Sequence, residues 1–264
     1  MRLVQSKWEW NKLDQVVLMF KETKNMKVRE LVAFDFDHTI VHDNTDVVVL
    51  KMLDSETEKN LVQYRKEYKI EWTDFMNMVF DQLFLKGFNK SDIAARLSTM
   101  ELSEGMKELL EKLKAFKADL DVVIVSDSNL FFIETILKQK NLAELFDAIY
   151  TNSSKFDSEE KLKIMPFHDH ACTTCPKNMC KSKILQEFKE KKLKLGIEYK
   201  TIYYVGDGFN DFCPLKMLSS EDFGFVRCGY SLEKLLNIEG NKSQIKGKIH
   251  TWKSATEIAE KVMI

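Results

Sequence analysis

The stretch Leu31-Val-Ala-Phe-Asp-Phe-Asp-His-Thr-Ile40 decides the fold, because an apolar strand ends there at two carboxylates. Asp35 and Asp37 stand two residues apart, although Asp favours turns and helix caps over a half-buried strand. Open α/β folds bind their ligands at the carboxyl ends of the strands. Concentrated negative charge at that place predicts a cation. Our hypothesis is therefore a divalent metal beside a carboxylate nucleophile.

The composition indicates a globular intracellular protein. Of its 264 residues, 44% are apolar and 11% aromatic, which suits a real core. The 40 basic and 41 acidic residues leave a net charge of −1, so no overall field favours nucleic acid or a membrane surface. No apolar run approaches the roughly 20 residues of a membrane span. The five cysteines accompany no export signal, so we expect reduced thiols and a cytoplasmic protein.

Predicted strands and helices alternate along most of the chain. Strands are expected at 30–36, 121–125, near 148–150, at 201–205, 223–227 and near 248–252. Helices are expected at 103–118, 130–140, 181–194, 231–237 and after 254, and 152–180 is expected to be irregular. This alternation predicts a Rossmann-like α/β fold, a three-layer sandwich in which helices cover both faces of a parallel sheet.

The predicted elements divide the chain into three parts. Residues 1–27 are predicted to be an N-terminal extension with a short packing helix. Residues 46–100 show helical apolar spacing and no good strand, so they are predicted to be a helical cap inserted into the fold. Residues 28–45 and 101–264 form the predicted catalytic core.

Three predicted strands end in polar side chains: Asp35 and Asp37, Ser126 and Asp127, and Asp207 with Asp211. In a parallel sheet these ends lie together, so residues distant in sequence converge. Any one of them alone is explained by a turn or a helix cap. Three together, with a lysine downstream, argue against that explanation and favour one functional site.

These residues carry a resemblance to a known family. Asp35-Phe-Asp37-His-Thr39, Ser126, Lys181 and Gly206-Asp-Gly-Phe-Asn-Asp211 resemble the four ordered motifs of the haloacid dehalogenase superfamily of phosphohydrolases. The longer stretches are similar to the phosphoethanolamine/phosphocholine phosphatase family, and within it to the branch named for pyridoxal phosphate phosphatase. These stretches are Asp35–Ile40, Ser126–Asn129, Cys175–Lys181 and Gly206–Asp211.

The resemblance implies Mg²⁺-dependent hydrolysis of a small phosphomonoester through an aspartyl-phosphate. Asp35 would be the nucleophile, and Asp37 would donate and then accept the proton. The metal ligands would be the Asp35 carboxylate, the Asp37 carbonyl and Asp207, with Asp211 as an outer support or a further ligand. Hard oxygen ligands of this kind suit Mg²⁺.

Two further positions would bind phosphate by the same resemblance. Ser126 would donate to a phosphoryl oxygen, and Lys181 would offset the charge of the phosphate and of the nucleophile. Lys177 and Lys183 lie close in sequence, so the choice of lysine rests on the motif alone. The alternative for Lys181 is a solvated lysine at a helix start.

The substrate remains open at this stage. The resemblance places Asp46 and Asp127 against the substrate, where a carboxylate pair suits the ammonium of phosphoethanolamine or phosphocholine. Alternatively, Asp46 caps a helix that starts at Val47, and Asp127 is a turn residue. Pyridoxal phosphate needs an apolar slot, for which the candidates are Trp72, Phe75, Met76 and Phe80. The same four residues would also suit internal packing of the insertion.

A run of potential metal ligands precedes Lys181. It has the pattern H-x-H-x-C-x₂-C-x₄-C and consists of His168, His170, Cys172, Cys175 and Cys180. The C-x₂-C spacing suits zinc, but the second half of a standard zinc module is missing, so free thiols are the alternative. Cys213 and Cys228 are interpreted as small buried apolar residues.

Two other functional classes share parts of this pattern. A phosphotransferase or protein phosphatase could use the same core, but an insertion as long as 46–100 would cover the site against bulky substrates. A non-catalytic metal-binding protein could retain the fold, but it would be expected to lack the nucleophile or the acid. We therefore expect a small-molecule phosphomonoester as the partner, with no nucleic acid or membrane, and the sequence indicates no protein partner.

Overall fold

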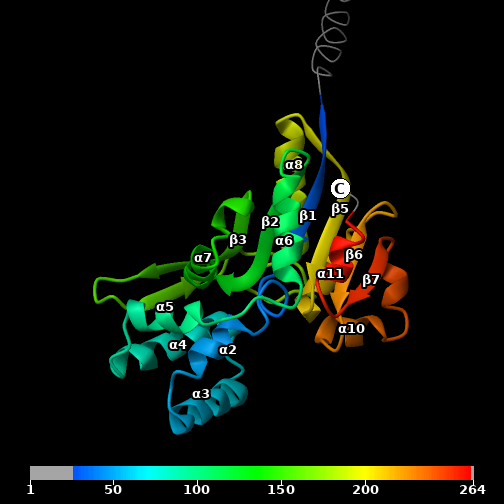
Figure 1. Cartoon of the computed structure of the whole chain (residues 1–264). Helices are drawn as coiled ribbons and strands as arrows, with labels where there is room; N and C mark the ends of the chain where they lie inside the picture. Colours follow the sequence, from blue (N-terminus) through cyan, green and yellow to red (C-terminus); the bar gives the residue numbers. More distant parts are fainter. Residues whose placement is uncertain (1–25, 263–264) are drawn as a thin grey trace, which may run out of the picture.

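The computed structural model describes residues 26–262, which contain one seven-stranded sheet (Figure 1). The strand order is β4-β3-β2-β1-β5-β6-β7. The strands are β1 (Lys27–Phe34), β2 (Leu120–Asn129), β3 (Ala148–Phe156), β4 (Leu162–Met165), β5 (Ile197–Gly206), β6 (Phe223–Arg227) and β7 (Lys248–Trp252). All neighbours in this sheet pair in parallel except β3 and β4, which are antiparallel.

The helices fall into two groups. Between β1 and β2 the chain forms α2 (Thr45–Leu50), α3 (Ser55–Tyr68), α4 (Trp72–Leu85), α5 (Lys90–Ser98) and α6 (Met106–Ala115). The later helices are α7 (Leu130–Gln139), α8 (Lys181–Lys194), α9 (Phe212–Lys216), α10 (Ser231–Leu236) and α11 (Thr256–Ala259). No helix between residues 26 and 262 combines the length and hydropathy needed to cross a bilayer.

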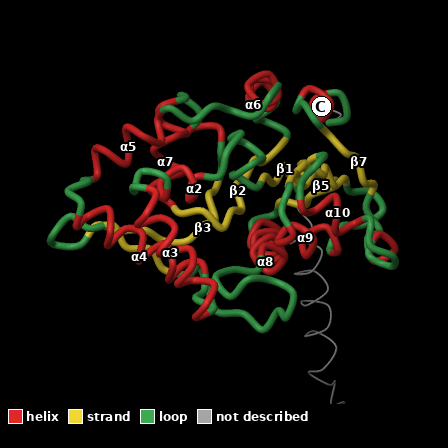
Figure 2. Tube along the Cα trace, turned by 90° about the horizontal axis from the view of Figure 1, so that it is seen from below, coloured by secondary structure: helices red, strands yellow, loops and turns green. Residues whose placement is uncertain are grey.

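Side chains that point alternately to the two faces of the sheet produce the predicted three-layer sandwich. In β1, Val32 and Phe34 belong to one buried cluster, and Leu31 and Ala33 belong to a second cluster on the opposite face. The first cluster includes side chains of α6, α7 and α11, and the second includes side chains of α8, α9 and α10. Figure 2 shows α6 and α7 on one side of the strands and α8 and α9 on the other. Burial on both faces explains why these strands are continuous apolar runs.

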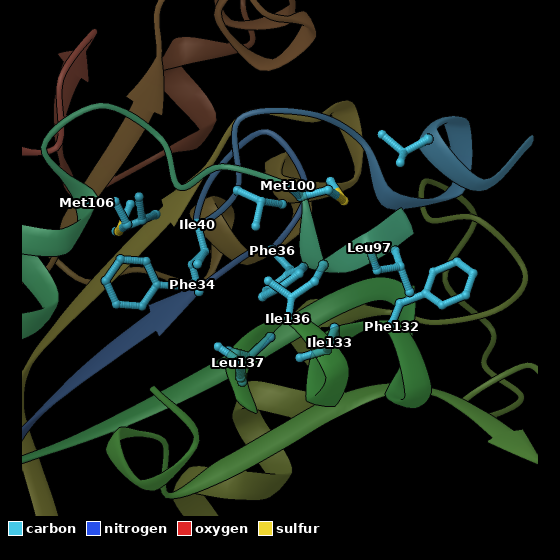
Figure 3. Close-up of a cluster of buried hydrophobic side chains, with 14 of the residues drawn as sticks. Phe34, Phe36, Ile40, Leu97, Met100, Met106, Phe132, Ile133, Ile136 and Leu137 are labelled. Carbon is cyan, nitrogen blue, oxygen red and sulfur yellow. The ribbon is translucent and has the colours of Figure 1, made fainter. Parts of the chain in front are cut away.

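The predicted helical insertion does not have a core of its own. The cluster that covers β1 continues into the insertion, where Leu97 lies with Phe132 and Ile133 of α7 (Figure 3). The rings of Phe80 and Phe132 meet edge to face, with centroids 5.9 Å apart. Helices α2 to α5 are therefore packed onto the core through the same apolar cluster that covers one face of the sheet.

The prediction that residues 152–180 are irregular is wrong in part. β3 continues to Phe156 and turns back into β4, which the short and mostly polar segments concealed. The turn is stabilised by Asp157, whose Oδ1 accepts from two backbone N–H groups. Asn77 of α4 pairs with the backbone of Ile164, donating to its O and accepting from its N, both at 2.9 Å. This pairing attaches the insertion to β4.

The N-terminal prediction is tested only at its end. Lys27 already belongs to β1, so this strand begins three residues before the predicted start at residue 30. The packing helix predicted within residues 1–27 lies outside the described residues.

The strand order reverses at β1, and this reversal positions the site. After β1 the chain moves outward through β2, β3 and β4, and it then returns through α8 to β5 on the other side of β1. Crevices form at the carboxyl ends of strands at such a switch point. Asp35 directly follows β1, and Asp207 directly follows β5.

Candidate active site

Lys181 joins two of the predicted carboxylates. Its Nζ lies 2.8 Å from Asp35 Oδ2 and 2.8 Å from Asp211 Oδ1, and its side chain is only 1% exposed. Burial lowers the pKa of Lys181, but the Asp211 and Asp35 carboxylates raise it by more, so the ammonium stays charged. By contrast, Lys177 and Lys183 form exposed pairs on the surface. Of these three lysines, Lys181 is the one that contacts the carboxylates.

Asp211 is held by several donors at once. Its Oδ2 accepts from the backbone N–H groups of Asp207 at 3.0 Å and Gly208 at 2.8 Å, and its Oδ1 accepts from Tyr204 and Lys181. The close packing requires glycine at 206, where a Cβ would lie 2.5 Å from Asp211 Cγ. Both oxygens of Asp211 are therefore already used, which favours the outer support over a direct ligand.

The carboxylates suit a hard cation. One carboxylate oxygen each of Asp35, Asp207 and Asp211 lies within 4.8 Å of the others. Burial and the neighbouring Asp211 raise the pKa of Asp207 to about 7, and burial raises the pKa of Asp35 although Lys181 opposes the rise. One ammonium faces several buried carboxyl groups, and a divalent cation would offset the remaining charge. All donors are oxygens, as Mg²⁺ prefers.

Asp37 is held by the first residue of α2. The backbone N–H of Thr45 donates to Asp37 Oδ1 at 2.9 Å, and the Thr45 hydroxyl donates to Oδ2 at 3.0 Å. Thr45 Oγ also lies 2.8 Å from Ser128 Oγ. Burial is the main cause that raises the pKa of Asp37 above its usual range, and the nearby Asp46 is the second. The hydrogen bonds from Thr45 oppose the rise. The sequence analysis missed Thr45 and Ser128.

Arg227 fixes the turn that connects the segment with Asp35 and Asp37 to α2. This arginine is the last residue of β6, and its guanidinium donates to the carbonyl of His38. His38 has a φ of 54°, an uncommon conformation for a residue other than glycine. The same guanidinium lies 3.3 Å from His42 Nδ1. Sequence reasoning missed Arg227, because an arginine at a strand end carries no motif.

Ser126 and Asp127 lie in β2 beside these residues. Ser126 is fully buried, and its Oγ accepts from Ser128 N at 3.3 Å. Asp127 lies within β2, so the alternative that it is a turn residue is wrong. Its Oδ2 accepts from Asn210 Nδ2 at 2.9 Å, and Asn210 precedes Asp211. Because β1 and β2 pair in parallel, Ser126 and Asp127 lie at the same end of the sheet as Asp35.

A pocket of about 420 Å³ opens beside Asp37 and between the insertion and the core. Asp46 Oδ2 accepts from Trp72 Nε1, whereas Asp46 Oδ1 is buried without a hydrogen-bond partner. The alternative that Asp46 caps the helix is wrong, because Asn44 is the N-cap of α2 and accepts from Val47 N at 3.0 Å. The pocket is lined by Asp37, Asn44, Asp46, Arg65, Glu71, Trp72, Asp127, Thr174, Cys175, Pro176, Asn178 and Phe209.

Of the four candidates for an apolar slot, Trp72 alone lines the pocket. Phe75, Met76 and Phe80 are buried in the cluster that joins the insertion to the core. This agrees with the alternative that these residues serve internal packing. Trp72 lines the pocket, and the Arg65 guanidinium lies 4.9 Å from its ring centroid. The sequence analysis missed Arg65, which adds one cation to a pocket otherwise rich in carboxylates.

Comparisons with known proteins find relatives over most of the chain. A model of the Putative Phosphatase family matches residues 30–264. The chain is 37% identical to the pyridoxal phosphate phosphatase PHOSPHO2 of Rattus norvegicus, over 88% of this chain and 96% of that protein. It is 33% identical to the phosphoethanolamine/phosphocholine phosphatase of Homo sapiens, over 87% of this chain and 86% of that protein.

Among solved structures, the chain resembles a phospho-aspartyl intermediate analogue of phosphoserine phosphatase. The TM-score is 0.60, the sequence identity is 19%, and the match covers 89% of this chain and 100% of the other. At this identity the likeness shows the fold alone, which is the α/β fold of the haloacid dehalogenase type.

Proposed function

The chain belongs to the Putative Phosphatase family of haloacid dehalogenase-like hydrolases, and we propose that it hydrolyses a small phosphomonoester through a phosphorylated Asp35, with Mg²⁺ as cofactor. Its class, a phosphoric monoester hydrolase, follows from the family. The observation that carries the proposed mechanism is the Lys181 ammonium 2.8 Å from both Asp35 and Asp211.

Mg²⁺ would be held by the Asp35 carboxylate, the Asp37 carbonyl and Asp207, and Asp211 would support them. When bound, it would neutralise charge on the phosphoryl oxygens, which repel carboxylates. The support comes from the clustered carboxylate oxygens and from Asp211, whose oxygens are both occupied by donors.

In the first step, a carboxylate oxygen of Asp35 forms a bond to phosphorus while the bond from phosphorus to the ester oxygen breaks. Asp37 gives its proton to the departing oxygen, which leaves as an alcohol. In the second step, Asp37 takes a proton from water as the water oxygen bonds to phosphorus and the bond between the Asp35 oxygen and phosphorus breaks. Phosphate leaves and Asp35 is restored. Acid–base help of this kind accelerates reactions by roughly 10²–10⁴-fold.

Lys181 and Ser126 bind the phosphoryl group in this proposal. The Lys181 ammonium would stay near Asp35 and offset the charge that accumulates as the phosphate approaches the nucleophile. Ser126 would donate its hydroxyl to a phosphoryl oxygen. Its burial within β2, where its Oγ accepts from Ser128 N, supports this position.

The helices α2 to α5 serve as the cap and select the leaving group. The pocket between Asp46, Trp72 and Asp127 has about 420 Å³, a volume that suits a small metabolite rather than a folded protein. We propose pyridoxal 5'-phosphate as the first candidate substrate, because relatives at 35–37% identity are named for it. Phosphoethanolamine or phosphocholine is the second candidate, favoured by the unpaired Asp46 Oδ1 and by Asp127. A cytoplasmic location is proposed because none of the five cysteines forms a disulfide.

A substrate panel tests this function. We would compare kcat/KM for pyridoxal 5'-phosphate, phosphoethanolamine, phosphocholine and phosphoserine with that for p-nitrophenyl phosphate, before and after chelation and return of Mg²⁺. The proposal expects one of the first three to exceed the generic ester, and activity to depend on returned Mg²⁺. If no metabolite exceeds the generic ester, the proposed substrate class is wrong. If chelation leaves activity intact, the metal assignment is wrong.

A further inference from the structure

Four cysteines from two distant segments meet beside the active site. Cys172, Cys175 and Cys180 lie on the loop before α8, and Cys213 lies on α9. The four sulfur atoms all lie within 4.8 Å of one another. Cys213 Sγ is 3.9 Å from Cys172 Sγ and 4.0 Å from Cys180 Sγ. A disulfide would need about 2.05 Å.

We propose that these four thiolates bind one structural Zn²⁺. Zinc bound by four cysteines is tetrahedral with Zn–S bonds of about 2.3 Å, so neighbouring sulfurs lie about 3.8 Å apart. The distances from Cys213 Sγ to the sulfurs of Cys172 and Cys180, 3.9 and 4.0 Å, are close to that value. Four protein ligands leave no open position for water or substrate, which distinguishes a structural site from a catalytic one.

The two histidines of the H-x-H-x-C-x₂-C-x₄-C run are not among the proposed ligands. His170 Nδ1 accepts from Cys172 N at 3.2 Å, and its Nε2 pairs with the carbonyl of Pro176 at 2.8 Å. His168 Nε2 accepts from Cys180 N at 3.2 Å. Both rings therefore hold the backbone of the cysteine loop. The ligand that completes the set is Cys213, which the sequence analysis interpreted as a small buried apolar residue.

The zinc would connect the two segments that bring Lys181 to Asp211. Cys180 directly precedes Lys181, and Cys213 lies two residues after Asp211. The same loop contributes Cys175 to the pocket. A metal bound to all four sulfurs would thus fix the start of α8 against α9 and hold the 2.8 Å contact of Lys181 with Asp211. In this role zinc positions the active-site residues and does not touch the reacting atoms.

Binding needs no oxidant or reductant. Each thiol gives up its proton to solvent as its sulfur bonds to the ion, so zinc affinity rises with pH. The site is chemically distinct from the oxygen site for Mg²⁺, because thiolates select zinc and carboxylates select magnesium.

The first test measures the zinc content of the full chain, purified with a reductant from zinc-supplemented medium. Elemental analysis should find about one zinc per chain. Cys213→Ser should lower this at least about tenfold, because it removes one of four ligands. The matched control is Cys228→Ser, which changes the one cysteine outside the cluster and should retain zinc. His170→Gln should also retain zinc, whereas a histidine-ligated site would lose it.

A second test does not depend on how the variants fold. A mercurial that blocks thiols should release zinc from the unmodified protein, and a colorimetric chelator would detect it. Replacement of zinc by Co²⁺ should give the intense visible and charge-transfer bands of a tetrahedral cobalt thiolate site. Zinc-free protein in which all five cysteines titrate as thiols would overturn the proposal. Zinc that persists in Cys213→Ser but disappears in His170→Gln would overturn the assigned ligands.

Discussion

Thr45 donates to both carboxylate oxygens of Asp37, through its backbone N–H at 2.9 Å and its hydroxyl at 3.0 Å. The hydroxyl is also 2.8 Å from Ser128 Oγ. A hydroxyl can both donate and accept. Thr45 can therefore donate to ionised Asp37, or accept from protonated Asp37 while it donates to Ser128. Asp37 keeps one orientation in both of the protonation states that acid–base catalysis needs.

Thr45→Val should lower kcat by about tenfold or more, because a hydrogen bond to a charged group is worth about 1.5–3 kcal/mol. The backbone donor to Asp37 remains, so substrate binding should change less than kcat. Steady-state kinetics across the neutral pH range would measure both the fall and the shift of the pH profile.

Thr45→Ser is the matched control, since it restores the hydroxyl in a slightly smaller side chain. Its kcat should stay within about threefold of the unmodified enzyme, as expected when the hydrogen bond survives. Equal kcat values and pH profiles in the valine and serine variants would show that the hydroxyl does not position Asp37.

Asp35→Asn should abolish Mg²⁺-dependent phosphate release, because a neutral amide cannot replace the attacking carboxylate. The fold should survive, since Lys181 keeps its ion pair with Asp211 at 2.8 Å. Phosphate release and the thermal unfolding midpoint would be measured on the same preparation.

The control is Asp43→Asn, the same chemical change at an exposed position of the same loop. It should leave phosphate release unchanged. Full activity in Asp35→Asn would refute the nucleophile, and loss of activity in both variants would point to a disturbed loop instead.

The parts of the site that could be predicted are those fixed by strand order. Asp35 and Asp207 follow neighbouring parallel strands, so a correct topology brings them together without knowledge of side-chain contacts. Lys181 was chosen from its motif, and the ion pair with Asp35 gives that choice a geometric basis. The alternating βα pattern predicted the three layers because both faces of the sheet are apolar.

The parts that could not be predicted depend on tertiary contacts. Arg227 reaches the turn at His38 only because β6 lies two strands from β1. Cys213 shows no spacing relation to Cys180, from which it is separated by α8 and β5. β4 has four residues, too few for a hydrophobic period to appear, and it is stabilised by the hairpin and by Asn77.

Asp121→Asn should destabilise the protein without changing its chemistry. Asp121 lies near the start of β2, and its carboxylate pairs with Arg29 and Lys192, each at 2.7 Å, with a side chain 4% exposed. Removing one partner of a buried ion pair costs about 3–5 kcal/mol. Arg29 keeps its bonds to backbone carbonyls, so we expect the free energy of unfolding to fall by about 3 kcal/mol.

Urea unfolding would measure this loss, and kcat/KM of the folded enzyme should be unaltered. Glu187→Gln is the comparison, because its 3.9 Å pair with Lys183 is exposed and should contribute less than about 1 kcal/mol. If both variants lost equal stability, burial of the Asp121 pair would not be the cause.

Asp46 should make the preference for cationic substrates depend on pH. Burial raises the pKa of its carboxyl to about 7. The hydrogen bond from Trp72 lowers this pKa, and the charge of Asp127 raises it. Being an acid, Asp46 is neutral below that pH and negative above it. Its attraction for an ammonium group is therefore present above the pKa and lost as the pH falls through it.

The ionised fraction of Asp46 rises about tenfold between about pH 6 and pH 8. The ratio of kcat/KM for phosphocholine to kcat/KM for p-nitrophenyl phosphate should rise by up to that factor, since effects common to both substrates cancel. In Asp46→Asn the ratio should be flat, and the same slope in that variant would assign the titration to another group.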